Sequence, residues 1–143
     1  MAMAHPVVPV PTPETQPFWD GVRAGELRLP RCRACGGVYF PPSPVCPHCT
    51  SRDIEWFTAS GDATLFSYVI HQRPSKLWKP DGPMSVALVS LAEGPMILST
   101  VVGCPQTPDA LVLDMPLRAT FVAFEEITVL AFEPAPDRAG VSR

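Results

Sequence analysis

The chain of 143 residues has little of what marks a membrane-spanning, secreted or polyanion-binding protein. Its best apolar run, residues 84–91, has the length of a strand and contains two serines, whereas a membrane-spanning helix needs about 20 apolar residues. Residues 1–13 are rich in proline and lack the basic start and apolar run of a secretory signal. The net charge of -3 supplies no basic field for a polyanion. We therefore expect a cytoplasmic protein with no membrane partner and no nucleic-acid partner.

Recognisable catalytic patterns are also missing. The chain has no serine elbow and no H-E-x-x-H motif. Cys104 is the only cysteine outside the two pairs described below, and His71 is the only histidine after those pairs. A nucleophile needs an activating base nearby, and a small thiol at the end of a strand is more often a buried structural residue. We expect no catalytic residue; an independent enzyme, a hydrolase or a lyase using Cys104 or His71, is the alternative.

The most specific motif in the chain is a pair of C-x-x-C sequences, formed by Cys32 and Cys35 and by Cys46 and Cys49. Two such knuckles predict a zinc ribbon, in which four thiolates fill a tetrahedral site and leave no position for a reactive water. The zinc is therefore expected to be structural. Iron would use the same thiolates, and spacing alone would also allow two disulfides, although a reducing compartment favours a metal.

One helix is predicted, over residues 16–24, with Pro17 in its first turn and Gly25 as its C-terminal stop. Phe18, Trp19 and Val22 form its apolar side. So short a helix cannot hide this side by itself. The three residues either pack on the rest of the chain or form a partner interface, and we weigh the two alternatives equally.

Beyond Cys49 the pattern has the period of two that is typical of strands. The expected strands are residues 54–58, 64–71, 84–92, 96–102, 117–123 and 128–132, with turns at 93–95 and 125–126, and residues 38–40 form a strand of the ribbon. This predicts a mostly β protein with a five- to six-stranded OB-fold barrel. The expected organisation is a flexible N-terminus (1–14), the helix and rubredoxin-like zinc ribbon (15–53), the barrel (54–133) and a flexible tail (134–143).

The order of motifs along the chain carries a family resemblance. The motifs are Pro17-Phe18-Trp19, Gly25-Glu26-Leu27-Arg28-Leu29, the knuckles with Cys35-Gly36, Phe40-Pro41-Pro42, Trp56, a strand from Thr64, Val102-Gly103-Cys104 and Met115-Pro116-Leu117-Arg118. With them, residues 15–132 resemble the acyl-CoA-associated family of zinc-ribbon plus OB-fold proteins known as domain of unknown function 35.

This resemblance implies an accessory subunit that is not an enzyme by itself. Members of that family are small partners of thiolase-superfamily enzymes, with roles that include degradation of sterol side chains and aromatic acids. It implies a heterotetramer around a thiolase-fold dimer, in which the partner cleaves a carbon–carbon bond of an acyl-CoA by thiolytic or retro-aldol chemistry. This subunit would stabilise the partner and help to shape its acyl-CoA site.

Residues 71–83 gather cations and an aromatic group in one loop. Arg73, Lys76 and Lys79 are candidates for the phosphates of coenzyme A, because guanidinium and ammonium groups suit phosphate oxygens. Trp78 is a candidate partner contact. The alternative is a solvated loop whose tryptophan closes the mouth of the barrel.

A single-strand nucleic-acid binder is the rival function from another class, because zinc ribbons and OB barrels both occur there. The stacking residues would be Trp56, Phe57, Phe66 and Tyr68. The low content of lysine and arginine counts against it.

Overall fold

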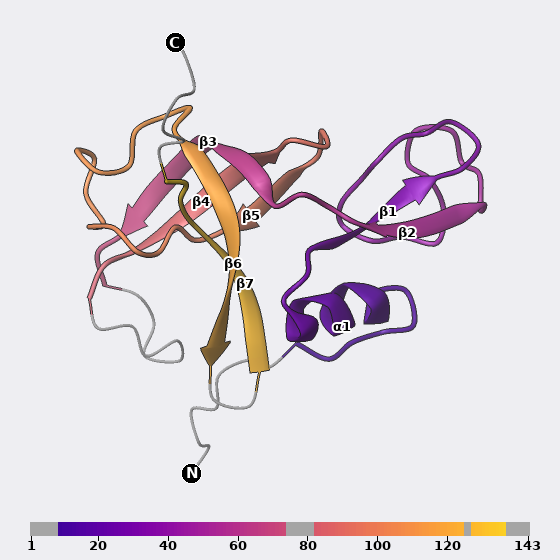
Figure 1. Cartoon of the computed structure of the whole chain (residues 1–143), viewed down its shortest axis with the longest axis horizontal. Coiled ribbons are helices and arrows are strands. Elements are labelled where there is room, and N and C mark those ends of the chain that lie inside the picture. Colours follow the sequence, from indigo (N-terminus) through magenta and orange to yellow (C-terminus); the bar gives the residue numbers. More distant parts are fainter. Residues whose placement is uncertain (1–8, 74–81, 125–126, 137–143) are drawn as a thin grey trace.

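The computed structural model describes residues 9–73, 82–124 and 127–136. The described chain has two parts joined side by side: a helix with a small two-stranded ribbon, and a curled sheet of five strands (Figure 1). No helix within these ranges is long and apolar enough to cross a membrane.

Helix α1 (Gln16–Ala24) begins and ends where the local sequence signals place it. Proline occupies its first turn, and Gly25 ends it in the left-handed conformation with φ of 78°, which a residue without a Cβ adopts at no steric cost. The helix packs against β1 and β7, so it bridges the ribbon and the barrel.

The ribbon sheet pairs β1 (Arg28–Cys32) with β2 (Ile54–Thr58) in antiparallel register, from Arg28 opposite Thr58 to Cys32 opposite Ile54. We expected residues 54–58 to be the first barrel strand, and the structure corrects this. Residues 38–40 were expected to form a ribbon strand, but only an isolated bridge between Val38 and Arg31 is present. The pairing with β1 stops after this bridge and a long hydrogen bond of 3.4 Å from the Tyr39 N–H to the Pro30 carbonyl, so the strand prediction for 38–40 was wrong.

The barrel sheet has the strand order β5-β4-β3-β6-β7, and all its pairs are antiparallel. Its strands are β3 (Asp62–His71), β4 (Met84–Leu91), β5 (Met96–Ser99), β6 (Pro116–Phe124) and β7 (Ile127–Pro134). The expected turn at 93–95 is confirmed by the hydrogen bonds from the Gly94 N–H to the Leu91 carbonyl and from the Leu91 N–H to the Pro95 carbonyl. Residues 125–126, expected to form another turn, lie outside the described residues.

The sheet curls until its two ends meet. Val101, just after β5, bridges to Phe132 of β7 in parallel orientation, and the Phe132 N–H donates to the Thr100 carbonyl at 2.9 Å. This near-closure is the expected OB-type barrel. It protects the backbone groups that an open edge would expose.

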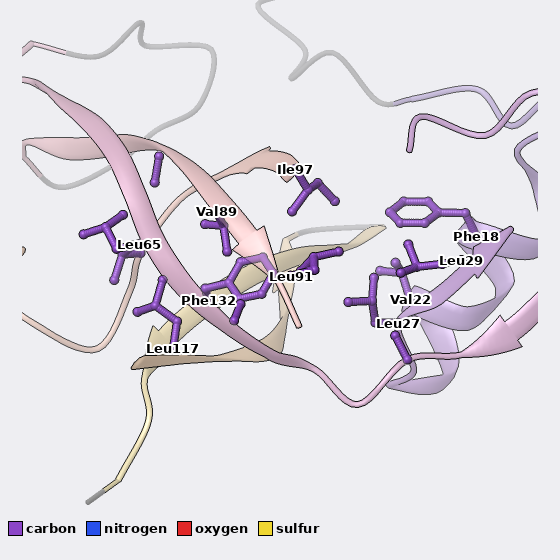
Figure 2. Close-up of a cluster of buried hydrophobic side chains, with 14 of the residues drawn as sticks. Phe18, Val22, Leu27, Leu29, Leu65, Val89, Leu91, Ile97, Leu117 and Phe132 are labelled. Carbon is purple, nitrogen blue, oxygen red and sulfur yellow. The ribbon is translucent and has the colours of Figure 1, made fainter. Parts of the chain in front are cut away.

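One hydrophobic core joins the helix to the barrel (Figure 2). Phe18, Val22 and Leu29 lie on the helix and ribbon side, and buried residues such as Leu65 and Phe132 lie on the barrel side. A second, much smaller cluster holds Cys32, Tyr39 and Cys46 at the far end of the ribbon, with Ile54 packed against it. The metal end of the ribbon is therefore packed separately from the rest of the chain.

Candidate metal centre and apolar cavity

The two cysteine knuckles have the same backbone geometry. In the first, the Cys32 carbonyl accepts from the Gly36 N–H, and the Cys32 N–H donates to the Gly37 carbonyl. In the second, the Cys46 carbonyl accepts from the Thr50 N–H, and the Cys46 N–H donates to the Ser51 carbonyl. Each turn needs a residue with positive φ at its fifth position, and this is Gly36 (76°) in one and Thr50 (65°) in the other. The tight turns bring both thiols of each pair to the same point.

The four sulfur atoms form one compact group. All lie within 4.8 Å of one another, and the Sγ atoms of Cys32 and Cys49 are 3.5 Å apart while those of Cys35 and Cys46 are 3.7 Å apart. Four sulfurs placed about 2.3 Å from a tetrahedral zinc are about 3.8 Å from each other. All five cysteines of the chain are free thiols, so the structure contains no disulfide.

The electrostatics of the donor set also call for a cation. A hydrogen bond from the backbone N–H of Cys35, with smaller contributions from neighbouring groups, lowers the pKa of Cys32 to about 7. The Ser51 N–H lowers the pKa of Cys49, but the thiol of Cys32, burial and the other two thiols outweigh it and raise that pKa to about 12. Four thiolates cannot all ionise side by side without a compensating charge. A dication supplies that charge, and no ligand position stays open for a substrate or a water.

The residues around the sulfurs hold the knuckles in place. The backbone N–H groups of Gly37 and His48 donate to the sulfurs of Cys35 and Cys46, at 3.4 and 3.3 Å. The ring of His48 lies against Gly37, where a Cβ would come within 2.6 Å of its Cδ2 atom. His48 is thus an exposed residue of the second turn whose ring packs on the first turn. The Tyr39 hydroxyl donates to the Ser43 carbonyl at 2.6 Å and ties down the loop between the knuckles.

A second feature, an apolar cavity of about 640 Å³, lies between α1 and the barrel. Phe18 and Trp19 of α1 and Phe40 of the ribbon form one wall, and residues of β4, β5, β6 and β7 form the other. Figure 2 shows Phe18 pointing from the helix toward the side of the barrel that carries Ile97, and both residues line the cavity. The helix thus covers part of the barrel and leaves a hollow beside the contact.

The helix residues proposed as a partner interface differ in how deeply they are buried. Phe18 and Val22 are buried in the chain's own core, at 6% and 1% exposure. The structure corrects the interface hypothesis for these two residues in favour of internal packing. Trp19 is half-buried, lies edge-on to Phe18 with ring centroids 5.1 Å apart and lines the cavity. Trp78 lies outside the described residues.

The predicted phosphate-binding loop is described only in part. Arg73 is exposed just after the end of β3, and His71 is exposed at that end and lines the cavity. Lys76 and Lys79 lie outside the described residues. The binding of coenzyme A phosphates by Arg73, Lys76 and Lys79 therefore stays a prediction.

Cys104 has the environment of a structural thiol. It is half-buried against the core, and burial raises the pKa of its thiol. A raised pKa disfavours the reactive thiolate. Within the described ranges no histidine hydrogen-bonds to it.

The aromatic residues considered for nucleic-acid stacking do not share one free surface. Trp56, Phe57 and Tyr68 pack against the core, and the Arg31 guanidinium covers the ring of Phe57 at 4.5 Å. Phe66 alone among the four is exposed, at the irregularity where the register of β3 shifts.

The sequence analysis did not predict the cavity walls on β5 and β7. A signal was present: Met96, Ile97 and Leu98 form an unbroken apolar run in a strand, so both faces of that strand are apolar. Ile97 is buried, but Leu98 is 67% exposed at the cavity. An apolar residue on the outer face of an edge strand could have indicated a binding surface.

Comparison with known proteins gives the same two-part division. Residues 19–55 match the family model described as ChsH2, rubredoxin-like zinc ribbon domain, and residues 56–122 match the one described as ChsH2, C-terminal OB-fold domain. The first description names zinc, which with the four converging sulfurs makes this a structural zinc site.

Two curated relatives are similar in sequence. The 3-oxo-4,17-pregnadiene-20-carboxyl-CoA hydratase alpha subunit of Mycobacterium tuberculosis is 38% identical over 121 residues, which cover 85% of this chain and 38% of that protein. A DUF35 domain-containing scaffold protein of Methanocaldococcus jannaschii is 33% identical over 98 residues, 67% of each chain. The chain thus spans well under half the length of the hydratase subunit.

A solved structure has a closely similar fold. A chain of the structure titled "Ltp2-ChsH2(DUF35) aldolase" superposes with a TM-score of 0.78 at 30% identity. The match covers 89% of this chain and 98% of that one.

Proposed function

Because the chain belongs to the DUF35 family of zinc-ribbon and OB-fold proteins, we propose that it is a noncatalytic subunit of an enzyme complex that acts on acyl-CoA thioesters. The relatives support this proposal by their names: one is a subunit of a CoA-ester hydratase, another is a scaffold protein, and a third belongs to an aldolase structure. The resemblance found in the sequence pointed to the same family.

The observation that carries the proposal is the closed metal site. Its four thiolates occupy every position of a tetrahedral ion, so the zinc can hold the ribbon together but cannot bind a substrate. The residues Cys32, Cys35, Cys46 and Cys49 would hold it. The only other thiol, Cys104, has a raised pKa and no hydrogen bond from a histidine within the described ranges. The chain therefore contributes structure, and its partner contributes the reacting groups.

In the detailed form of the proposal, the partner is a thiolase-superfamily enzyme and the complex is a heterotetramer around a thiolase-fold dimer in the cytoplasm. The partner cleaves a carbon–carbon bond of the acyl-CoA by retro-aldol or thiolytic chemistry, in the breakdown of sterols, bile acids or other fatty or aromatic acids. It supplies the groups that stabilise the enolate next to the thioester carbonyl. This subunit stabilises the partner and its acyl-CoA site.

Partner and phosphate contacts are assigned to Trp19, which lines the cavity, and to residues 73–79, which follow β3 in the sequence. Trp19 is half-buried and so has surface left for a partner, and Trp78 is the second aromatic contact. Arg73, which is exposed and makes no ion pair with any described residue, meets a phosphate of coenzyme A together with Lys76 and Lys79.

Co-expression tests this function. The chain is produced with the thiolase-like protein encoded beside it, purified through a tag on one of the two, and acyl-CoA cleavage is measured for each protein alone and for the complex. We expect co-purification and cleavage only when the catalytic partner is present, with the complex more active than the partner alone. A chain that stays alone, or that cleaves acyl-CoA without a partner, would refute the proposal.

A further inference from the structure

The cavity between α1 and the barrel has walls suited to an uncharged, apolar ligand. Among the described residues, its lining includes no aspartate, glutamate, lysine or arginine. Its volume of about 640 Å³ lies in the usual range of small-molecule sites, about 300–1,000 Å³. The cavity opens to solvent, since its wall residues Leu98 and His71 are exposed, and burying the apolar surface of a ligand against its walls is favourable. The size and the lining together favour a hydrocarbon ligand over an ion or a polar metabolite.

The serine hydroxyl groups in the wall already have partners. The Ser85 hydroxyl accepts from the Val101 N–H at 3.0 Å and donates to the Val101 carbonyl at 3.2 Å. The Ser99 hydroxyl donates to the Leu130 carbonyl at 3.1 Å. Among the described residues, no buried side-chain polar atom of this wall is left unpaired. The interior therefore offers contact area and no specific polar recognition.

The cavity is asymmetric in polarity along its length. His71, the only titratable wall residue in the described part of the chain, sits at the end of β3, and exposed Arg73 follows two residues later. Trp19 and Phe18 form the aromatic side on α1. A ligand that is apolar along its body and anionic at one end would fit this arrangement, because the anionic end could lie beside His71 and Arg73 in solvent.

We propose that this cavity binds the apolar acyl part of an acyl-CoA thioester, with the coenzyme A part leaving at the His71 end. The choice of acyl-CoA as the ligand rests on the function proposed above, whereas the apolar character of the site rests on its walls alone. The subunit then contributes part of the substrate-binding surface and selects for the size of the acyl group.

Titration of the full-length, zinc-loaded chain with lauroyl-CoA, laurate and coenzyme A tests the assignment by calorimetry. We expect lauroyl-CoA to bind with a negative heat-capacity change, the mark of apolar burial, and coenzyme A to bind at least about 10-fold more weakly. The ligand should also change the fluorescence of Trp19 in a variant where Trp56 and Trp78 are phenylalanine.

Two substitutions test the location. Val129→Trp places a large side chain in the cavity from its half-buried wall, and lauroyl-CoA affinity should fall about 10-fold or more. Val69→Trp is the matched control, because Val69 is 63% exposed on β3 and does not line the cavity; its affinity should not change. Leu98→Trp, at an exposed wall position, replaces Val129→Trp if that variant does not fold.

The outcomes separate this inference from the proposed function. Equal affinity for coenzyme A and lauroyl-CoA, or unchanged affinity in the cavity variants, would overturn the cavity assignment even if the chain still joined and activated its partner. Lauroyl-CoA binding that the Val129→Trp change abolishes would support the cavity even if no catalytic complex formed.

Discussion

Replacing Cys46 with serine should release the zinc and unfold the metal end of the ribbon while the barrel stays folded. Cys46 is completely buried and is one of the three members of the small core at that end. A serine hydroxyl does not ionise near neutral pH and is a poor zinc ligand. The large core of the helix and barrel contains neither Cys46 nor the knuckles.

The expected effect follows from the free energies of zinc binding and apolar burial, which stabilise the segment, and from its chain entropy, which opposes folding. Structural zinc sites contribute roughly 10–16 kcal/mol, so one ligand of four is worth about 3 kcal/mol, or about 100-fold in zinc affinity. Without the metal, burial of Tyr39 and Ile54 contributes about 1.5–3 kcal/mol each. Ordering residues 33–53 costs on the order of 20 kcal/mol or more in chain entropy. The apolar core of this segment is therefore far too small to hold it without zinc.

The assay combines zinc analysis of the purified protein with a two-dimensional amide NMR spectrum. After dialysis against a chelator that leaves the unsubstituted chain zinc-loaded, we expect Cys46→Ser to contain substoichiometric zinc and to show collapsed amide dispersion for residues 33–53, with the barrel amides unchanged. Cys104→Ser is the matched control, since its sulfur lies outside the metal site, and it should keep full zinc. Stoichiometric, tightly held zinc in Cys46→Ser would refute the four-thiolate site, and loss of the barrel signals would refute the separate packing of the two cores.

Two further predictions concern backbone strain and core packing. Gly36→Ala should cost about 1–2 kcal/mol, since a Cβ there meets no atom within 4 Å and only the positive φ opposes it; Thr50→Gly, at the equivalent position, should stabilise by about 0.5 kcal/mol. Zinc-loaded thermal melts measure both, and equal effects of the two changes would contradict the equivalence of the knuckles. Phe132→Ala should cost about 3–5 kcal/mol because Phe132 is fully buried, whereas Phe66→Ala, at a half-exposed position, should stay within about 0.5 kcal/mol in urea unfolding. Similar losses in both would show that the barrel core is not where the structure places it.

The parts of the fold that depend on neighbours in sequence could be predicted. The helix bounds came from Pro17 and Gly25, and the metal ligands came from the spacing of the cysteines. Both signals act within a few residues, so no distant contact was needed to read them. The barrel strands were found from their period-two pattern, although their ends moved by one to three residues.

The pairing of strands could not be read in the same way. Residues 54–58 have the pattern of a strand, but that pattern is the same whether the partner is β1 or a barrel strand. The structure pairs them with β1, because Ile54 must close the metal core opposite Cys32. Strand β2 lies at the border of the two parts, so the predicted domain bounds, with the border between residues 53 and 54, stay a prediction.

The sequence by itself determined the four metal ligands, the helix and the β character of the second part, because each is specified by local spacing and period. Only the tertiary structure decided which apolar side chains are buried in the core and which stay open to a ligand or partner. Phe18 and Val22 are used internally, while Trp19 and Leu98, from segments far apart in the chain, meet at one cavity. An apolar side chain carries no local mark of which other segment will cover it. That outcome depends on how the helix packs across the closed barrel.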